Sequence, residues 1–256
     1  MERVRPLLAA LLFAGCATAS ADEPLTAEAI VASAYDAAGG EMWRRPRTLA
    51  ITGYGIFYDG AEPVRHERHS MWRVYDAVKT NARSADGKVR IESVRDGVPV
   101  IDVAFDGETT STARGPQPKS AADARWASNF GFGVIRHALE DGYTVNRLPD
   151  EPVDGRAAYT LRVTDPQGGD TLFAIRQSDF AIVKVAFDTE RGWHERTYSD
   201  FFSKPDTSWQ QPGRVRLTYD GVKANEVIWT DFEVNADLPD CLFVLPEVEG
   251  CRLYNK

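Results

Sequence analysis

The sequence predicts a mainly β (α+β) fold: a strongly curved antiparallel sheet or incomplete β-barrel, with short helices as a lid over its concave side. Three observations predict it. Apolar and polar residues alternate with period two over most of the chain after Pro46. Asp-Gly pairs, which favour tight hairpin turns, recur between the alternating segments. About three short helical segments remain, too few to cover both faces of roughly a dozen strands, and twist would curl such a sheet.

Residues 1–21 have the pattern of a secretory signal peptide. Arg3 and Arg5 form a basic start, Leu7 to Ala14 is apolar but too short to span a bilayer, and Ala19-Ser20-Ala21 supplies the small residues of a cleavage site. We therefore expect export to the periplasm and exclude this segment from the fold. An alternative stays open, because Phe13-Ala14-Gly15-Cys16 resembles a lipobox in which Cys16 would carry a lipid anchor in the envelope.

Helices are predicted in three places. Leu25–Ala38 places apolar residues on one face, Thr26 can cap its start, and Gly39-Gly40 ends it. Two shorter helical segments, Ala121–Ser128 and Val134–Glu140, interrupt the middle of the chain.

Strands are predicted wherever the alternation is sustained between turn residues. They are Thr48–Tyr58, His66–Tyr75, Val78–Ser84, Lys88–Val94, Val98–Phe105, Glu108–Ala113, Thr144–Leu148, Ala157–Thr164, Thr171–Arg176, Ile182–Asp188, Trp193–Phe202, Arg214–Tyr219 and Asn225–Val234. No linker, repeat or low-complexity segment divides them, so we expect residues 22–256 to form one domain.

Charge and cysteine content narrow the function further. The chain carries a formal net charge of −8 and no basic stripe, which argues against a nucleic-acid partner. Cys241 and Cys251 are the cysteines that remain after cleavage. In an oxidising compartment their spacing predicts a disulfide that closes a C-terminal loop, residues 241–251; two free buried thiols are the alternative.

Several segments resemble LolA/LolB-like periplasmic lipoprotein-sorting proteins in the broad sense. The start Ala37-Ala38-Gly39-Gly40-Glu41-Met42-Trp43, with the strand at Thr48–Gly53, is similar to the opening of those proteins. Four later segments resemble the C-terminal strands and the ending of those proteins: Phe180–Val185, Tyr198–Phe201, Pro212–Leu217 and Leu238–Pro246. The resemblance implies a half-open β-barrel with a helical lid and a hydrophobic cavity that takes acyl chains. The loop closed by Cys241 and Cys251 is an addition to this pattern.

Candidates for binding cargo are large apolar residues that share a strand face or lie in the lid. In the lid they surround Gly131 and Gly133, which would allow bending; a rigid helix that plugs the core is the alternative. Stripes on strands are typical of solid core as well, but the scarcity of covering helices favours a cavity. The candidates are Tyr54, Ile56, Tyr58, Met71, Tyr75, Trp126, Phe130, Phe132, Ile135, Leu217, Ile228 and Phe232.

No catalytic or metal-binding constellation is predicted. His66 and His69 are three apart on a strand, so they are expected on opposite faces, as solvated polar residues. Neither a Gly-x-Ser-x-Gly nor a His-Glu-x-x-His motif occurs, and the Asp-Gly pairs fit turns better than a calcium loop. We therefore expect a protein that is not an enzyme and needs no metal or cofactor.

The sequence thus predicts a periplasmic carrier, expected to be a monomer, that holds a lipid or the acyl chains of a lipoprotein in a β-barrel cavity. Burial contributes about 0.8 kcal/mol per methylene, so affinity needs no covalent chemistry. A transient envelope protein partner is possible for such a carrier. The alternative is a non-transporting envelope sensor or protein-interaction module on the same fold.

Overall fold

The computed structural model describes residues 24–60, 62–75, 87–119, 132–246 and 251. Four predicted features lie outside the described residues: the signal peptide with Cys16, the strand Val78–Ser84, the helix Ala121–Ser128 and the lid residues Trp126 and Phe130.

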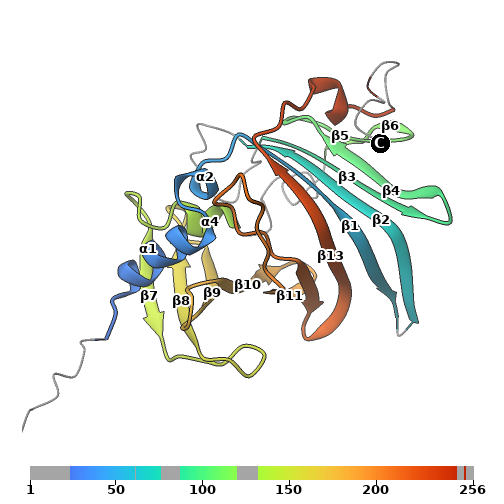
Figure 1. Ribbon diagram of the computed structural model, residues 1–256. Helices are drawn as coiled ribbons and strands as arrows, with labels where there is room; N and C mark the ends of the chain where they lie inside the picture. The colour runs from blue at the N-terminus through green and yellow to red at the C-terminus, as the bar shows by residue number, and fades with distance from the viewer. Residues whose placement is uncertain (1–23, 61, 76–86, 120–131, 247–250, 252–256) are drawn as a thin grey trace, which may run out of the picture.

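Within the described residues, thirteen strands form one antiparallel sheet in the order β6-β5-β4-β3-β2-β1-β13-β12-β11-β10-β9-β8-β7. The sheet curves strongly around three short helices, and its edges β6 and β7 do not pair, so the barrel stays open (Figure 1). The predicted fold class is confirmed. The strands are β1 (Thr48–Asp59), β2 (Glu62–Val74), β3 (Lys88–Arg95), β4 (Val98–Phe105), β5 (Thr110–Thr112), β6 (Gly115–Pro116), β7 (Thr144–Leu148), β8 (Ala158–Thr164), β9 (Asp170–Arg176), β10 (Ile182–Thr189), β11 (Gly192–Ser199), β12 (Arg214–Tyr219) and β13 (Val222–Val234).

The first helix, α1 (Ala27–Ala38), forms as its sequence predicts. The Thr26 hydroxyl accepts a hydrogen bond from the Ala29 amide (3.2 Å), which caps the N-terminus. Gly39 ends the helix with φ at 133°, a conformation that side chains with a Cβ rarely adopt. The short helix α2 (Glu41–Arg44) follows directly and buries Trp43.

The helices pack on the concave side of the sheet (Figure 1). Ile30, Val31 and Ala34 of α1 are fully buried in the main core with residues of β8 and β9. The Tyr35 hydroxyl donates a hydrogen bond to the carbonyl oxygen of Ile135 (2.7 Å) in α4 (Phe132–Arg136), and burial raises the pKa of Tyr35 to about 12. These contacts fix α1 and α4 to each other. No helix among the described residues has the length and apolar run needed to cross a bilayer.

Two Asp-Gly pairs act as the tight turns that the sequence predicts. Asp96-Gly97 joins β3 to β4 and Asp220-Gly221 joins β12 to β13, with φ values of 55°, 75°, 48° and 78°. Positive φ at both central residues is the requirement of a two-residue hairpin whose twist matches the strands.

Several predicted boundaries are wrong; for example, β2 and β13 each start before their predicted first residue. The helix expected at Val134–Glu140 is α4, which starts earlier and ends at Arg136; tighter three-residue turns follow it. The strand expected at Trp193–Phe202 stops at Ser199, because Asp200 takes a positive φ of 55°. Gly115-Pro116, which lies outside the predicted strands, forms the short edge strand β6.

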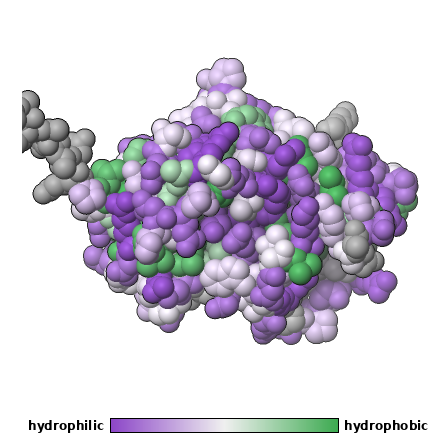
Figure 2. Space-filling view, turned by 90° about the horizontal axis from the view of Figure 1, so that it is seen from below, coloured by the Kyte–Doolittle hydropathy of each residue, from purple (hydrophilic) through white to green (hydrophobic). Residues whose placement is uncertain are grey.

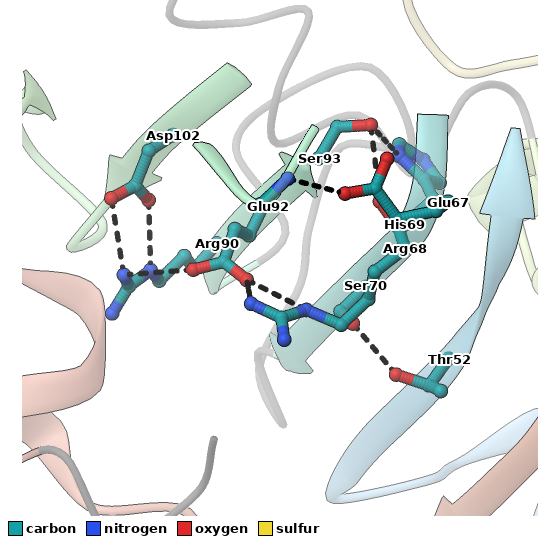
Figure 3. Close-up of polar contacts among 10 residues, drawn as sticks. Thr52, Glu67, Arg68, His69, Ser70, Arg90, Glu92, Ser93 and Asp102 are labelled. Carbon is teal, nitrogen blue, oxygen red and sulfur yellow. Dashed lines mark hydrogen bonds and ion pairs between the residues drawn. The ribbon is translucent and has the colours of Figure 1, made fainter. Parts of the chain in front are cut away.

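The C-terminal segment covers the face of β1–β4 that points away from the helices. The 3-10 helix η2 (Asp240–Phe243) buries Leu242 and Phe243 against Trp72. On the same face Arg68, Arg90, Glu92 and Asp102 form a chain of ion pairs, with N–O distances of 2.7 Å for Arg68–Glu92 and 3.0 Å for Arg90–Asp102 (Figure 3). Polar residues on this face are therefore paired and part of the structure.

The predicted disulfide between Cys241 and Cys251 is confirmed, with Cα atoms 6.0 Å apart. Its removal in the double variant Cys241→Ser, Cys251→Ser is expected to lower the free energy of unfolding by about 2–3 kcal/mol, because the cross-link restricts the unfolded chain. Urea unfolding monitored by circular dichroism measures the change. Wild-type protein reduced with dithiothreitol should reproduce the same midpoint, and an unchanged midpoint in the variant would contradict the expectation.

Candidate functional site

A cavity of about 740 Å³ lies on the concave side of the sheet, which is within the range of pockets that bury most of a small ligand. Aromatic and aliphatic side chains from both halves of the sheet and from the helices form its wall. They include Trp43, Leu49, Ile51, Phe57, Met71, Tyr75, Ile91, Ile182, Phe187, Val215, Leu217, Tyr219, Val227, Trp209 and Trp229.

The predicted binding residues are distributed unevenly. Met71, Tyr75 and Leu217 lie on the cavity wall. Ile135 and Phe232 are buried in the main core beside it, at 0% and 2% exposure, and Phe132 lies in α4. Tyr54, Ile56, Tyr58 and Ile228 do not line the cavity either.

The prediction chose the wrong face of β1. Leu49, Ile51 and Phe57 point to the cavity, but the inward positions between them are Gly53 and Gly55, which carry no side chain. A Cβ at Gly53 would collide with the carbonyl oxygen of Ile228 on the neighbouring strand, so glycine is required there. The period-two pattern therefore selects the outer set Tyr54, Ile56 and Tyr58 instead.

Outward aromatic residues on β1 are covered by cations. The guanidinium carbon of Arg65 lies 5.2 Å from the centre of the Tyr54 ring, and the Lys223 Nζ lies 5.8 Å from that of Tyr58. Such side chains shield apolar surface with their aliphatic stems. Tyr54 and Tyr58 are accordingly half-buried without lining the cavity.

A bulge in β13 separates two of the predicted binding residues, Ile228 and Phe232. Thr52 pairs with Asp231 but Gly53 pairs with Trp229, so one residue of β13 is left over at Thr230. Because of this extra residue, Ile228 and Phe232 cannot share a face. Trp229, which sequence reasoning missed, is buried and lines the cavity.

A second bulge corrects the prediction for two histidines. Gly53 pairs with His69 and Gly55 with His66, so β2 carries one residue more than β1 between them. His66 and His69 therefore face the same side: their Nδ1 atoms lie 2.7 Å and 3.2 Å from the Ser93 Oγ. Figure 3 shows His69 beside Ser93. Both are buried, not solvated. Among the residues described, no group of three or more potential ligands is placed to hold a metal ion.

The histidines of the cavity wall are held in the neutral form. Burial, followed by the charges of His66 and Arg196, lowers the pKa of His69 to about 4. Burial, followed by the charges of Arg196 and Arg191, lowers the pKa of His194 to about 3. The His194 ring stacks on Phe187 with centroids 4.6 Å apart, so it behaves as part of the aromatic wall at neutral pH.

Four arginines also line the cavity, which the sequence pattern did not predict. Arg136 of α4 is only 6% exposed and its guanidinium carbon lies 4.8 Å from the ring centres of both Trp43 and Tyr75. This cation–π contact links α4 to α2 and to the end of β2. The other arginines of the wall are Arg176, Arg191 and Arg196.

The face seen from below carries mostly polar residues with small hydrophobic groups between them (Figure 2). The aromatic residues named above are instead gathered on the inner side of the curved sheet. These aromatic side chains therefore face the cavity and not this outer face.

The fold of this chain is similar to that of several solved structures. The chain is similar to a LolA superfamily protein from Nitrosomonas europaea, with a TM-score of 0.51 and 16% identity over 86% of this chain and 98% of that chain. A DUF1329 family protein from Desulfovibrio piger gives a TM-score of 0.50 and 10% identity over 85% and 97% of the two chains. No protein-family model and no curated protein matches the sequence. The predicted resemblance is thereby confirmed at the level of the fold.

Proposed function

We propose that the protein binds a hydrophobic cargo, a lipid or the acyl chains of a lipoprotein, in this cavity and carries it through the bacterial envelope. The observation that carries the proposal is the cavity of about 740 Å³ with an aromatic and aliphatic wall. Burial of each methylene contributes about 0.8 kcal/mol, so a long acyl chain is held firmly by such a wall.

The proposed location is the periplasm, with an anchor at Cys16 as the alternative. The basic, apolar and small-residue pattern of residues 1–21 supports export. The fold similarity to a LolA superfamily protein agrees with the resemblance to periplasmic lipoprotein-sorting proteins described above. Binding, and not catalysis, is the activity that an apolar wall of this kind serves.

Transfer between vesicles tests the carrier function. Donor vesicles contain a fluorescent fatty-acyl probe together with a quencher of its fluorescence, and acceptor vesicles contain neither. The protein is added in an amount far below that of the probe. We expect the rate of probe transfer to rise in proportion to protein concentration, since each molecule shuttles cargo repeatedly.

Two results would separate this proposal from its rivals. Saturable probe binding without transfer would replace the carrier with a sensor that only recognises its ligand. Failure of the protein both to bind and to transfer the probe would remove the proposal altogether.

A further inference from the structure

The charges on the cavity wall are strongly unbalanced. Among the described residues that line it, four are arginines, and the one carboxylate is Asp179. Asp179 accepts hydrogen bonds from Arg176 Nε (2.7 Å) and Nη2 (2.6 Å), so its charge is already matched by Arg176. The described lining of this cavity in an otherwise acidic protein therefore holds three further arginines, Arg136, Arg191 and Arg196, and no second carboxylate.

Two of these cations lie together with a histidine on the β10–β11 hairpin. Arg191, His194 and Arg196 all line the cavity, and we call them the head-group subsite. The guanidinium carbon of Arg191 lies 4.3 Å from the centre of the Tyr219 ring, and the His194 ring lies 5.2 Å from the same ring. The charges of both arginines reach His194. The three groups thus form one cluster around Tyr219.

The subsite contains a buried polar atom that has no hydrogen-bond partner within the described chain. His194 is 3% exposed, and its Nε2 is buried without a partner there. Burying an unsatisfied polar group is costly, and native structures usually satisfy such groups. A ligand oxygen in the cavity would complete this one.

The environment of Arg196 also favours an anionic ligand. Burial and the like charge of Arg73 both lower its pKa, while the nearby Tyr198 and Tyr219 oppose the shift. Arginine nevertheless stays protonated in proteins, so the charge remains at the cavity wall. A buried guanidinium that keeps its charge at the wall of a largely apolar cavity favours an anionic group in the ligand.

From this arrangement we propose that the cargo is an anionic amphiphile with a single acyl chain, whose carboxylate or phosphate head binds at Arg191, His194 and Arg196 inside the cavity. The chain then lies along the wall formed by residues such as Phe187, Leu217 and Trp229. Arginine forks and an imidazole N–H are suited to carboxylate and phosphate oxygens. This inference rests on the proposed function and adds the chemical class and the orientation of the cargo.

Competition against a neutral acyl probe bound to delipidated protein tests the inference. The competitors share a twelve-carbon chain and differ in the head: dodecanol, dodecanoate and dodecyl phosphate. Acetate and inorganic phosphate serve as anions without a chain. We expect the two anionic amphiphiles to compete about ten to a hundred times more strongly than dodecanol, the range of one charge-assisted hydrogen bond, and the chainless anions not to compete.

Variants locate the effect. Arg196→Gln and, separately, Arg191→Gln should remove most of the preference for the anionic heads over dodecanol. The matched control is Arg162→Gln, which removes the same charge from an exposed position on β8 and should retain the preference. Arg191 is exposed, so Arg191→Gln is expected to fold. If Arg196→Gln fails to fold, Arg191→Gln and the head-group preference of the wild type still test the inference.

The outcomes distinguish this inference from the proposed function. Equal binding of all three amphiphiles would overturn the head-group subsite and leave a neutral acyl-chain carrier. Competition by inorganic phosphate as strong as that by dodecyl phosphate would also overturn it, in favour of a small-anion site. If no amphiphile binds, the proposed function itself fails.

Discussion

The substitution Val215→Trp is expected to abolish acyl-chain binding while leaving the protein folded and about as stable as the wild type. Val215 is half-buried on β12 and faces the cavity, so a larger side chain enters open space and does not displace packed neighbours. Overpacking destabilises a filled core by typically 1–3 kcal/mol, whereas filling a hollow avoids this cost. Titration with a fluorescent fatty-acyl probe measures binding, and thermal unfolding measures stability.

The control for this variant lies on the same strand. Thr218→Trp adds the same bulk at a position that is absent from the cavity wall, and it should bind the probe like the wild type. Retained binding in Val215→Trp would place the ligand elsewhere. A loss of several kcal/mol of stability in Val215→Trp would instead indicate that the space is already filled by the chain.

Acidification from pH 7 to 5 is expected to lower the free energy of unfolding by up to about 2 kcal/mol for each of His69 and His194. Their folded pKa values are about 4 and about 3, below the ordinary 6.5, because burial and neighbouring cations disfavour the charged ring. Between pH 6.5 and the folded pKa the unfolded chain binds more protons than the native state. Stability is therefore complete above pH 6.5 and is lost as the pH falls through this window.

Urea unfolding at a series of pH values measures this dependence. His194→Phe keeps an aromatic ring against Phe187 and removes the titrating group, so the variant should show a shallower loss below pH 6.5. His137→Gln is the matched control, since it removes an imidazole that does not line the cavity. A slope in His194→Phe as steep as that of the wild type would show that His194 does not contribute.

Local signals in the sequence were sufficient for most element types, but not for the short elements α2 and β6. Thr26 and Gly39 set the ends of α1, and Asp96-Gly97 and Asp220-Gly221 made the tight turns that order neighbouring strands. These features depend on the conformational preferences of one or two residues, and the residue types alone indicate those preferences.

The lining of the cavity depends on information that the alternation pattern lacks. The bulge at Thr230 and the bulge between His66 and His69 each change which residues face inward, and the alternation pattern does not show where they occur. Gly53 and Gly55 leave gaps in the inward stripe of β1, so the outward aromatic residues gave the stronger pattern.

The cationic part of the site was missed for a different reason. In β11 the inward residues His194 and Arg196 are as polar as their outward neighbours, so the strand shows no apolar face. Polar residues on a strand usually point to solvent, and a sequence rule follows that tendency. A departure from such a rule is typical of a functional site, which agrees with the subsite proposed for the β10–β11 hairpin.

Native mass spectrometry of delipidated protein mixed with dodecanoate most directly tests the central claim that this sheet encloses a space for an amphiphile. The account predicts a complex with one or a few ligands per chain that persists on dilution and is missing in Val215→Trp. A spectrum that shows only the unliganded mass at saturating dodecanoate would contradict it.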